Sequence, residues 1–125
     1  MILNPKWLTV AHVRWLALGC TILIFIACIL PSHDLPDLSS GRDKWTHLAA
    51  FGPLGFLWCW VGYKRVWVLL AGAGFGLLIE IYQGAFTSSR SFDWFDLVAD
   101  TVGVALGIVA FGLLRSYLQL KNDPR

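Results

Sequence analysis

Residues Val66–Phe86 read VWVLLAGAGFGLLIEIYQGAF, an apolar run whose only charged side chain is Glu80. Its length is close to the ~20 residues that a helix needs to cross the hydrocarbon core of a bilayer. An open strand in a membrane leaves backbone polar groups unpaired, so the run predicts a transmembrane helix. Similar apolar stretches predict further spans at about Val13–Leu30, Trp45–Val61 and Phe95–Leu114. We therefore expect residues 1–125 to form a single domain, an all-α integral membrane protein built as a four-transmembrane-helix bundle.

The composition agrees with this fold class and excludes others. Of the 125 residues, 57% are hydrophobic and only 14% are charged, whereas soluble domains contain roughly 25% charged residues. The formal net charge of +2 is too small to create a surface for polyanions, so we expect no nucleic-acid partner. Cys20, Cys28 and Cys59 lie in apolar runs without metal-site spacing, and we interpret them as small buried hydrophobes.

The positive charges predict the orientation of the bundle, because cytoplasmic loops of membrane proteins are enriched in Lys and Arg. Seven of the ten Lys and Arg residues fall near the two termini or between the second and third spans. We therefore expect both termini in the cytoplasm. A competing interpretation treats the first span as a cleaved lipoprotein signal ending before Cys28, but the bulky Phe25 three positions earlier disfavours it.

The acidic residues are concentrated at one end of the predicted bundle. Seven of the eight fall in the extracytoplasmic loops or in the outer ends of the spans. Glu80 precedes the outer end of its span by about six residues, which places it roughly 9 Å below the interface. A carboxylate at this depth is costly unless it is paired. Asp96 and Asp100 are four residues apart, so they share one face of the fourth helix, and we expect that face to point into the bundle.

Other polar residues are predicted at the same level. In the second span His47 follows Asp43 by four residues and Lys44 by three, so the three share a face. Gln83 lies in the last turns of the third span, and Arg90 follows in the next loop, where its guanidinium can bind carboxylates. We therefore predict an extracytoplasmic polar pocket made of nine residues: Asp43, Lys44, His47, Glu80, Gln83, Arg90, Asp93, Asp96 and Asp100.

Two interpretations of this pocket stay open. Charged residues inside a membrane indicate a functional site, and the candidates for acid–base catalysis are His47, Glu80 and Asp96. A buried network of ion pairs can equally hold four helices in register without any chemistry. Carboxylate oxygens suit Mg²⁺, and they could come from Glu80, Asp93, Asp96 and Asp100. Their spacing is not diagnostic, so we predict no metal site and assign no cofactor.

Three polar motifs in these spans resemble the signature of a known family. They are Asp43-Lys44-x-x-His47-x-x-x-Phe51, then Glu80-x-x-Gln83, then Arg90-x-x-Asp93-x-x-Asp96-x-x-x-Asp100-x-x-Gly103-x-x-x-Gly107. In this order and at transmembrane positions they resemble the VanZ-like membrane proteins over about Asp43–Gly107. The sequence departs from the family pattern at Asp100, where Asn is common, and at Thr87-Ser88-Ser89, where a Pro-Gly turn is usual.

The resemblance implies a protein of the bacterial cytoplasmic (inner) membrane. The relatives that give the family its name are linked to low-level resistance to the lipoglycopeptide teicoplanin, but the family has no established molecular activity. We therefore expect an envelope protein that alters how teicoplanin-like lipoglycopeptides or envelope lipids interact with the membrane. Whether it is an enzyme stays open.

One alternative is a membrane-embedded enzyme that acts on a lipid or on a lipid-linked phosphate headgroup. Glu80 or Asp96 would serve as the general base or as a metal ligand. His47 would act as an acid or a base, and Arg90 or Lys44 would bind the phosphate.

A second alternative is a structural or accessory role. The bundle would then pair with itself as a homo-oligomer, or join a larger membrane complex, through glycine faces such as Gly103 and Gly107. Close packing of helices within one bundle is the simpler interpretation of these glycines.

Overall fold

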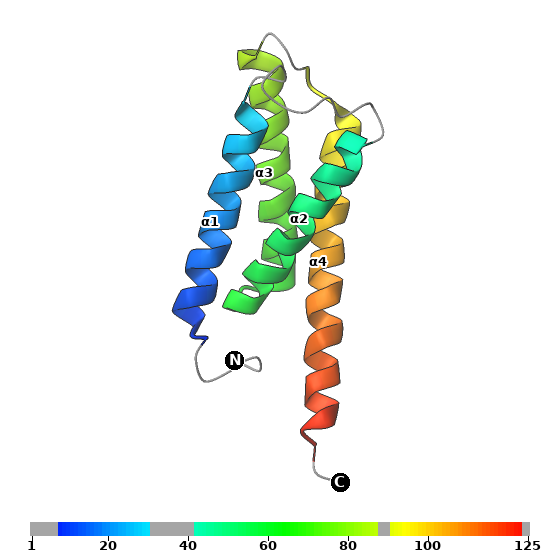
Figure 1. The fold of residues 1–125 in the computed structure, drawn as a ribbon. Coiled ribbons are helices and arrows are strands. Elements are labelled where there is room, and N and C mark those ends of the chain that lie inside the picture. The colour runs from blue at the N-terminus through cyan, green and yellow to red at the C-terminus, as the bar shows by residue number, and fades with distance from the viewer. Residues whose placement is uncertain (1–7, 31–41, 88–90, 124–125) are drawn as a thin grey trace.

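The structure is a computed structural model that describes residues 8–30, 42–87 and 91–123. These residues form four α-helices, α1 (Val10–Ile29), α2 (Arg42–Val61), α3 (Arg65–Phe86) and α4 (Trp94–Lys121). Successive helices run in opposite directions, so the start of α1 and the end of α4 lie at the same end of the bundle (Figure 1). The all-α prediction is confirmed, and each predicted apolar stretch overlaps one helix.

Three of the described helices, α1, α3 and α4, are long and apolar enough to cross a membrane. Helix α2 is not among them, since its first turns are polar and contain Lys44 and His47. Large apolar side chains also cover the outside of the bundle, among them Trp15 and Leu113, which are 72% and 67% exposed. Such a surface suits contact with lipid and not with water. That α2 completes a fourth span stays a prediction.

The helix boundaries differ from the predicted spans where polar residues extend a helix. The side chain of Thr9 accepts a hydrogen bond from the backbone N–H of His12, and the His12 ring bonds back to the Thr9 backbone N–H. This capping box starts α1 before the predicted Val13. Helix α4 continues past the predicted Leu114 to Lys121, because a helix can continue through polar residues beyond the apolar stretch.

Helices α2 and α4 pack closely because glycines leave room between their backbones. A Cβ atom on Gly103 would lie 2.8 Å from the carbonyl oxygen of Leu48, and one on Gly107 would overlap the carbonyl oxygen of Gly52. The two α4 glycines therefore allow backbone to approach backbone. This confirms their interpretation as positions of close packing within the bundle.

A small apolar core lies where α2, α3 and α4 meet. It contains the fully buried side chains of Phe51, Ile79 and Val104. His47 precedes Phe51 by four residues, hence by one turn on the same face of α2, and Glu80 directly follows Ile79 in α3. The core therefore ends where the polar side chains begin, toward the end of the bundle away from the start of α1.

Candidate functional site

His47 of α2 and Asp100 of α4 form a buried pair. Nδ1 of His47 lies within hydrogen-bonding distance of Oδ1 of Asp100, at 2.7 Å. The two residues are only 6% and 0% exposed. Asp96, one turn earlier in α4, is also buried, and its Oδ2 lies 3.8 Å from Nε2 of His47. The structure thus brings both carboxylates of the predicted α4 face to one imidazole.

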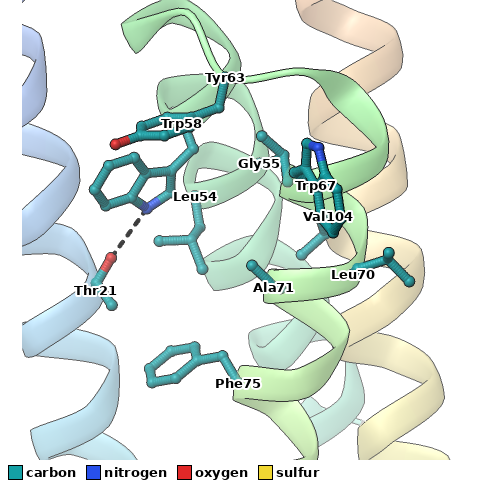
Figure 2. A pocket seen from close by; sticks show the side chains of 12 residues that line it. Thr21, Leu54, Gly55, Trp58, Tyr63, Trp67, Leu70, Ala71, Phe75 and Val104 are labelled. Atoms are coloured by element: carbon teal, nitrogen blue, oxygen red, sulfur yellow. Dashed lines mark hydrogen bonds between the residues drawn. The ribbon is translucent and has the colours of Figure 1, made fainter.

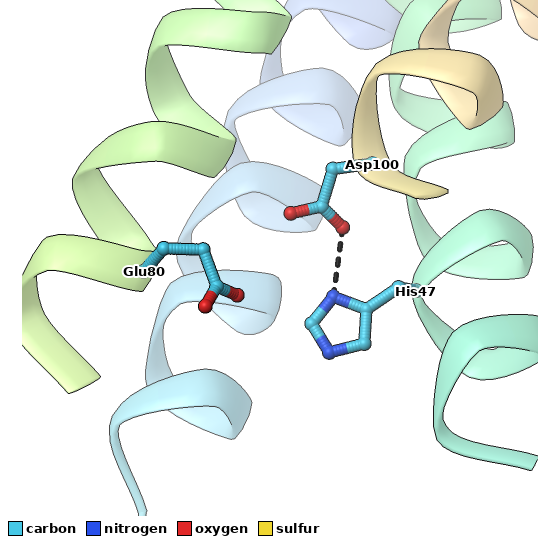
Figure 3. Close-up of side chains that lie close together, drawn as sticks. All are labelled: His47, Glu80 and Asp100. Carbon is cyan, nitrogen blue, oxygen red and sulfur yellow. Dashed lines mark hydrogen bonds and ion pairs between the residues drawn. The ribbon is translucent and has the colours of Figure 1, made fainter. Parts of the chain in front are cut away.

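Glu80 reaches this pair from α3, so the cluster joins three helices (Figure 3). Its side chain is fully buried. Oε2 accepts a hydrogen bond of 2.8 Å from the backbone N–H of Asp93, whereas Oε1 has no hydrogen-bond partner within the described part of the chain. An unsatisfied buried polar group costs about 1–3 kcal/mol, more when it is charged. Helix packing alone therefore does not explain why this oxygen is buried without a hydrogen bond.

Lys44 and Asp93 form the partly exposed edge of the site. The Lys44 Nζ lies 3.4 Å from Oδ2 of Asp93 and 3.5 Å from Oδ1 of Asp96. Partial burial by itself raises the pKa of the Asp93 carboxyl. The hydrogen bond from the Phe95 backbone N–H and the charge of Lys44 outweigh this effect, so the pKa lies below its ordinary value. Asp93 also caps the start of α4 through that Phe95 bond.

The remaining predicted pocket residues divide into two groups. Gln83 is buried, but its amide nitrogen donates a hydrogen bond of 2.8 Å to the carbonyl oxygen of Cys28 near the end of α1. It therefore fastens α3 to α1. The side chain of Asp43 and the whole of Arg90 lie outside the described residues, and their place in the pocket stays a prediction.

His47, Glu80 and Asp100 also have the arrangement of a metal-ligand set. Each offers one ligand atom, and these atoms all lie within 4.8 Å of one another. Gly76 makes room for the cluster on α3, because a Cβ atom there would lie only 2.9 Å from Oδ2 of Asp100. The metal ligands considered from the sequence were carboxylates of α3 and α4, whereas this set adds the imidazole of His47 and takes one residue from each of three helices. The same side chains could also exchange a proton with a bound molecule.

The structure also contains an apolar pocket of about 840 Å³ that the sequence does not predict, lined mainly by α2 and α3, with Thr21 of α1 and Val104 of α4. Its lining includes Thr21, Leu54, Trp58, Tyr63, Trp67 and Phe75 (Figure 2). The Trp58 Nε1–H donates a hydrogen bond of 3.2 Å to Oγ1 of Thr21, which links α2 to α1. The only signal in the sequence is the group of aromatic residues around the turn between α2 and α3.

Comparison with known proteins supports the resemblance found in the motifs. The family model described as VanZ/LLP1 matches residues 11–115. The match covers the predicted motifs and most of α1, which contributes no motif residue. Neither a curated protein nor a solved structure matches this chain.

Proposed function

Because this chain belongs to the VanZ/LLP1 family, we propose that it is a bacterial inner-membrane protein that alters how lipoglycopeptides or envelope lipids interact with the membrane. In this proposal α2 completes a fourth span, both termini are cytoplasmic, and the cluster of His47, Glu80 and Asp100 lies in the extracytoplasmic half. The observation that carries the proposal is this cluster. Its three polar side chains come from three helices and are at most 6% exposed.

The state of Glu80 favours a binding role over a purely structural one. A network that only holds helices together gains most when every buried polar atom is paired. Within the described part of the chain, the buried Oε1 atom of Glu80 has no hydrogen-bond partner. Binding sites commonly hold such groups at a cost to stability. A polar headgroup or an ion that donates to or coordinates this oxygen would account for it.

The proposed orientation rests on the distribution of Lys and Arg and can be tested with single cysteines. In a variant without the native cysteines, Ser39→Cys places a thiol between the first two helices, and Ser116→Cys places one near the end of α4. A membrane-impermeant maleimide should label Ser39→Cys in intact cells and Ser116→Cys only after permeabilisation. The reverse pattern would refute the orientation.

The function itself is tested by teicoplanin susceptibility. Deletion of the gene should lower the inhibitory concentration in its host, and expression of the wild type should restore it. Glu80→Gln should fail to restore it at an equal level in the membrane, whereas the matched control Asp123→Asn, a change in the exposed C-terminal segment, should restore it fully. Unchanged susceptibility after both deletion and overexpression would refute the proposal.

A second candidate is a membrane-embedded enzyme that acts on a lipid or lipid-linked phosphate headgroup. The 2.7 Å contact between His47 and Asp100 favours it, because a carboxylate that orients an imidazole is a common arrangement for acid–base catalysis. Mass spectrometry of lipid extracts tests this candidate. A lipid that accumulates in the deletion strain should disappear with the wild type but not with His47→Gln, while identical lipid profiles would exclude it.

A further inference from the structure

We propose that His47, Glu80 and Asp100 bind a divalent transition-metal ion. The inference deepens the proposed function, on which it rests in treating the cluster as a binding site, by naming what the site holds. The ligand atoms come from α2, α3 and α4 and lie within 4.8 Å of one another. Ions with bonds of about 2.1 Å hold their ligand atoms roughly 3–4.2 Å apart. Small side-chain rotations are therefore enough to close the site around an ion.

Glu80 is the residue that points most directly to a ligand. It is fully buried, and its Oε1 atom has no hydrogen-bond partner among the described residues. Figure 3 shows its carboxylate directed toward His47 and Asp100. The backbone N–H of Asp93 donates to Oε2 and so orients the carboxylate. Such support from a neighbouring group is typical of metal ligands.

The pair of His47 and Asp100 supplies the other side of the site. The 2.7 Å between Nδ1 and Oδ1 shows that both side chains are already fixed at short range. A metal ion would replace the proton that links them, since ligands bind in the deprotonated form. Gly76 leaves the space that the Asp100 carboxylate occupies against α3. The site is therefore enclosed by helices and not by surface side chains.

The set of donor atoms indicates which metals fit. One imidazole and two carboxylates are the ligands of many sites for Fe²⁺, Mn²⁺ and Zn²⁺, whereas sites for Ca²⁺ and Mg²⁺ use oxygen ligands almost throughout. Two carboxylate charges also match the charge of one divalent ion. We therefore expect Zn²⁺ and Mn²⁺ to bind more tightly than Mg²⁺.

Cobalt is a suitable probe because its visible absorption reports coordination. The full-length protein in detergent, first treated with a chelator, is titrated with Co²⁺, and bound metal is measured by mass spectrometry. We expect one equivalent of Co²⁺, new visible absorption bands and displacement of the Co²⁺ by Zn²⁺. Glu80→Gln and Asp100→Asn should each weaken binding at least tenfold, whereas Asp123→Asn should bind like the wild type.

Several results would overturn the proposal. Binding of less than about a tenth of an equivalent of Co²⁺ by the wild-type protein would refute the metal site. This result needs no variant, so it does not depend on whether a variant folds. Equal binding by the wild type and both site variants means that the metal lies elsewhere. Loss of teicoplanin tolerance in Glu80→Gln without metal binding by the wild type would refute the metal site and leave the proposed function standing.

Discussion

Replacing Gly107 by alanine should loosen the contact between α2 and α4. The added Cβ atom would overlap the carbonyl oxygen of Gly52 and lie 2.8 Å from the backbone nitrogen of Phe56. Both are backbone atoms of α2, so no side-chain rotation can relieve the contact. The two helices must move apart, and the packing between them is then lost along several turns.

The magnitude follows from two opposing effects. Overpacking of this kind costs about 1–3 kcal/mol, while alanine is favoured over glycine in a helix by up to about 1 kcal/mol. We expect Gly107→Ala to lower the free energy of unfolding by about 1–2 kcal/mol. Gly74→Ala is the matched control, because no atom lies within 4 Å of its new Cβ atom. It should change stability by at most about 1 kcal/mol, in the stabilising direction.

Unfolding in mixed micelles of mild detergent and sodium dodecyl sulfate, followed by circular dichroism, gives both free energies. The two variants should differ by about 2 kcal/mol, which is roughly a 30-fold difference in the unfolding equilibrium constant. Gly107→Ala that is as stable as Gly74→Ala would refute the close backbone contact. Loss of an oligomer at unchanged stability would instead assign the Gly107 face to contacts between chains.

Three further predictions concern the polar site. Glu80→Gln keeps an acceptor for the Asp93 N–H and removes a buried charge. We therefore expect the free energy of unfolding in mixed micelles to fall by less than about 1 kcal/mol or to rise. A loss of about 3–5 kcal/mol would favour the structural alternative. In Lys44→Met the pKa of Asp93 should move back up toward its ordinary value, which carboxyl ¹³C chemical shifts measure during a pH titration. Because that pKa is lowered in the folded protein, the stabilising contribution of Asp93 is present at neutral pH and is lost as the pH falls through the folded pKa. An unchanged pKa would show that the charge of Lys44 does not lower it. Zn²⁺ at about 100 times its Kd should stabilise the wild type by about 2.7 kcal/mol in the same unfolding assay but not Asp100→Asn, and equal stabilisation of both proteins would contradict the proposed ligand set.

Much of the fold could be predicted because a membrane span is recognisable from the length of an apolar run. All four helices lie where apolar runs were found. The errors are at the ends: α4 continues to Lys121 because hydropathy marks what lies in lipid and not where a helix stops. The same limit applies to α2, whose polar first turns keep it below the other three helices in hydropathy.

The candidate site could be predicted only as a set of residues at one level of the bundle. Spacing indicates which residues share a helix face, as with Asp96 and Asp100. It does not indicate how the helices are rotated against one another, which decides the partners. Two contacts depend on that rotation: the pairing of His47 with Asp100, and the hydrogen bond that the Gln83 amide donates to the Cys28 carbonyl oxygen. The apolar pocket likewise comes from the spacing between helices, for which the sequence carries no periodic pattern.

The length of α4 has a consequence for labelling experiments. Its 28 residues measure about 42 Å, whereas the hydrocarbon core is roughly 30 Å thick, and a helix would need to tilt by about 44° to hide this mismatch, more than the usual range of up to 40°. In the proposed topology the last turns before Lys121 project from the bilayer into the cytoplasm. After permeabilisation, an antibody or a fluorophore can reach these turns without entering the membrane. Because Asp100 lies on the same helix, a label on the last turns reports movements of α4 at the site.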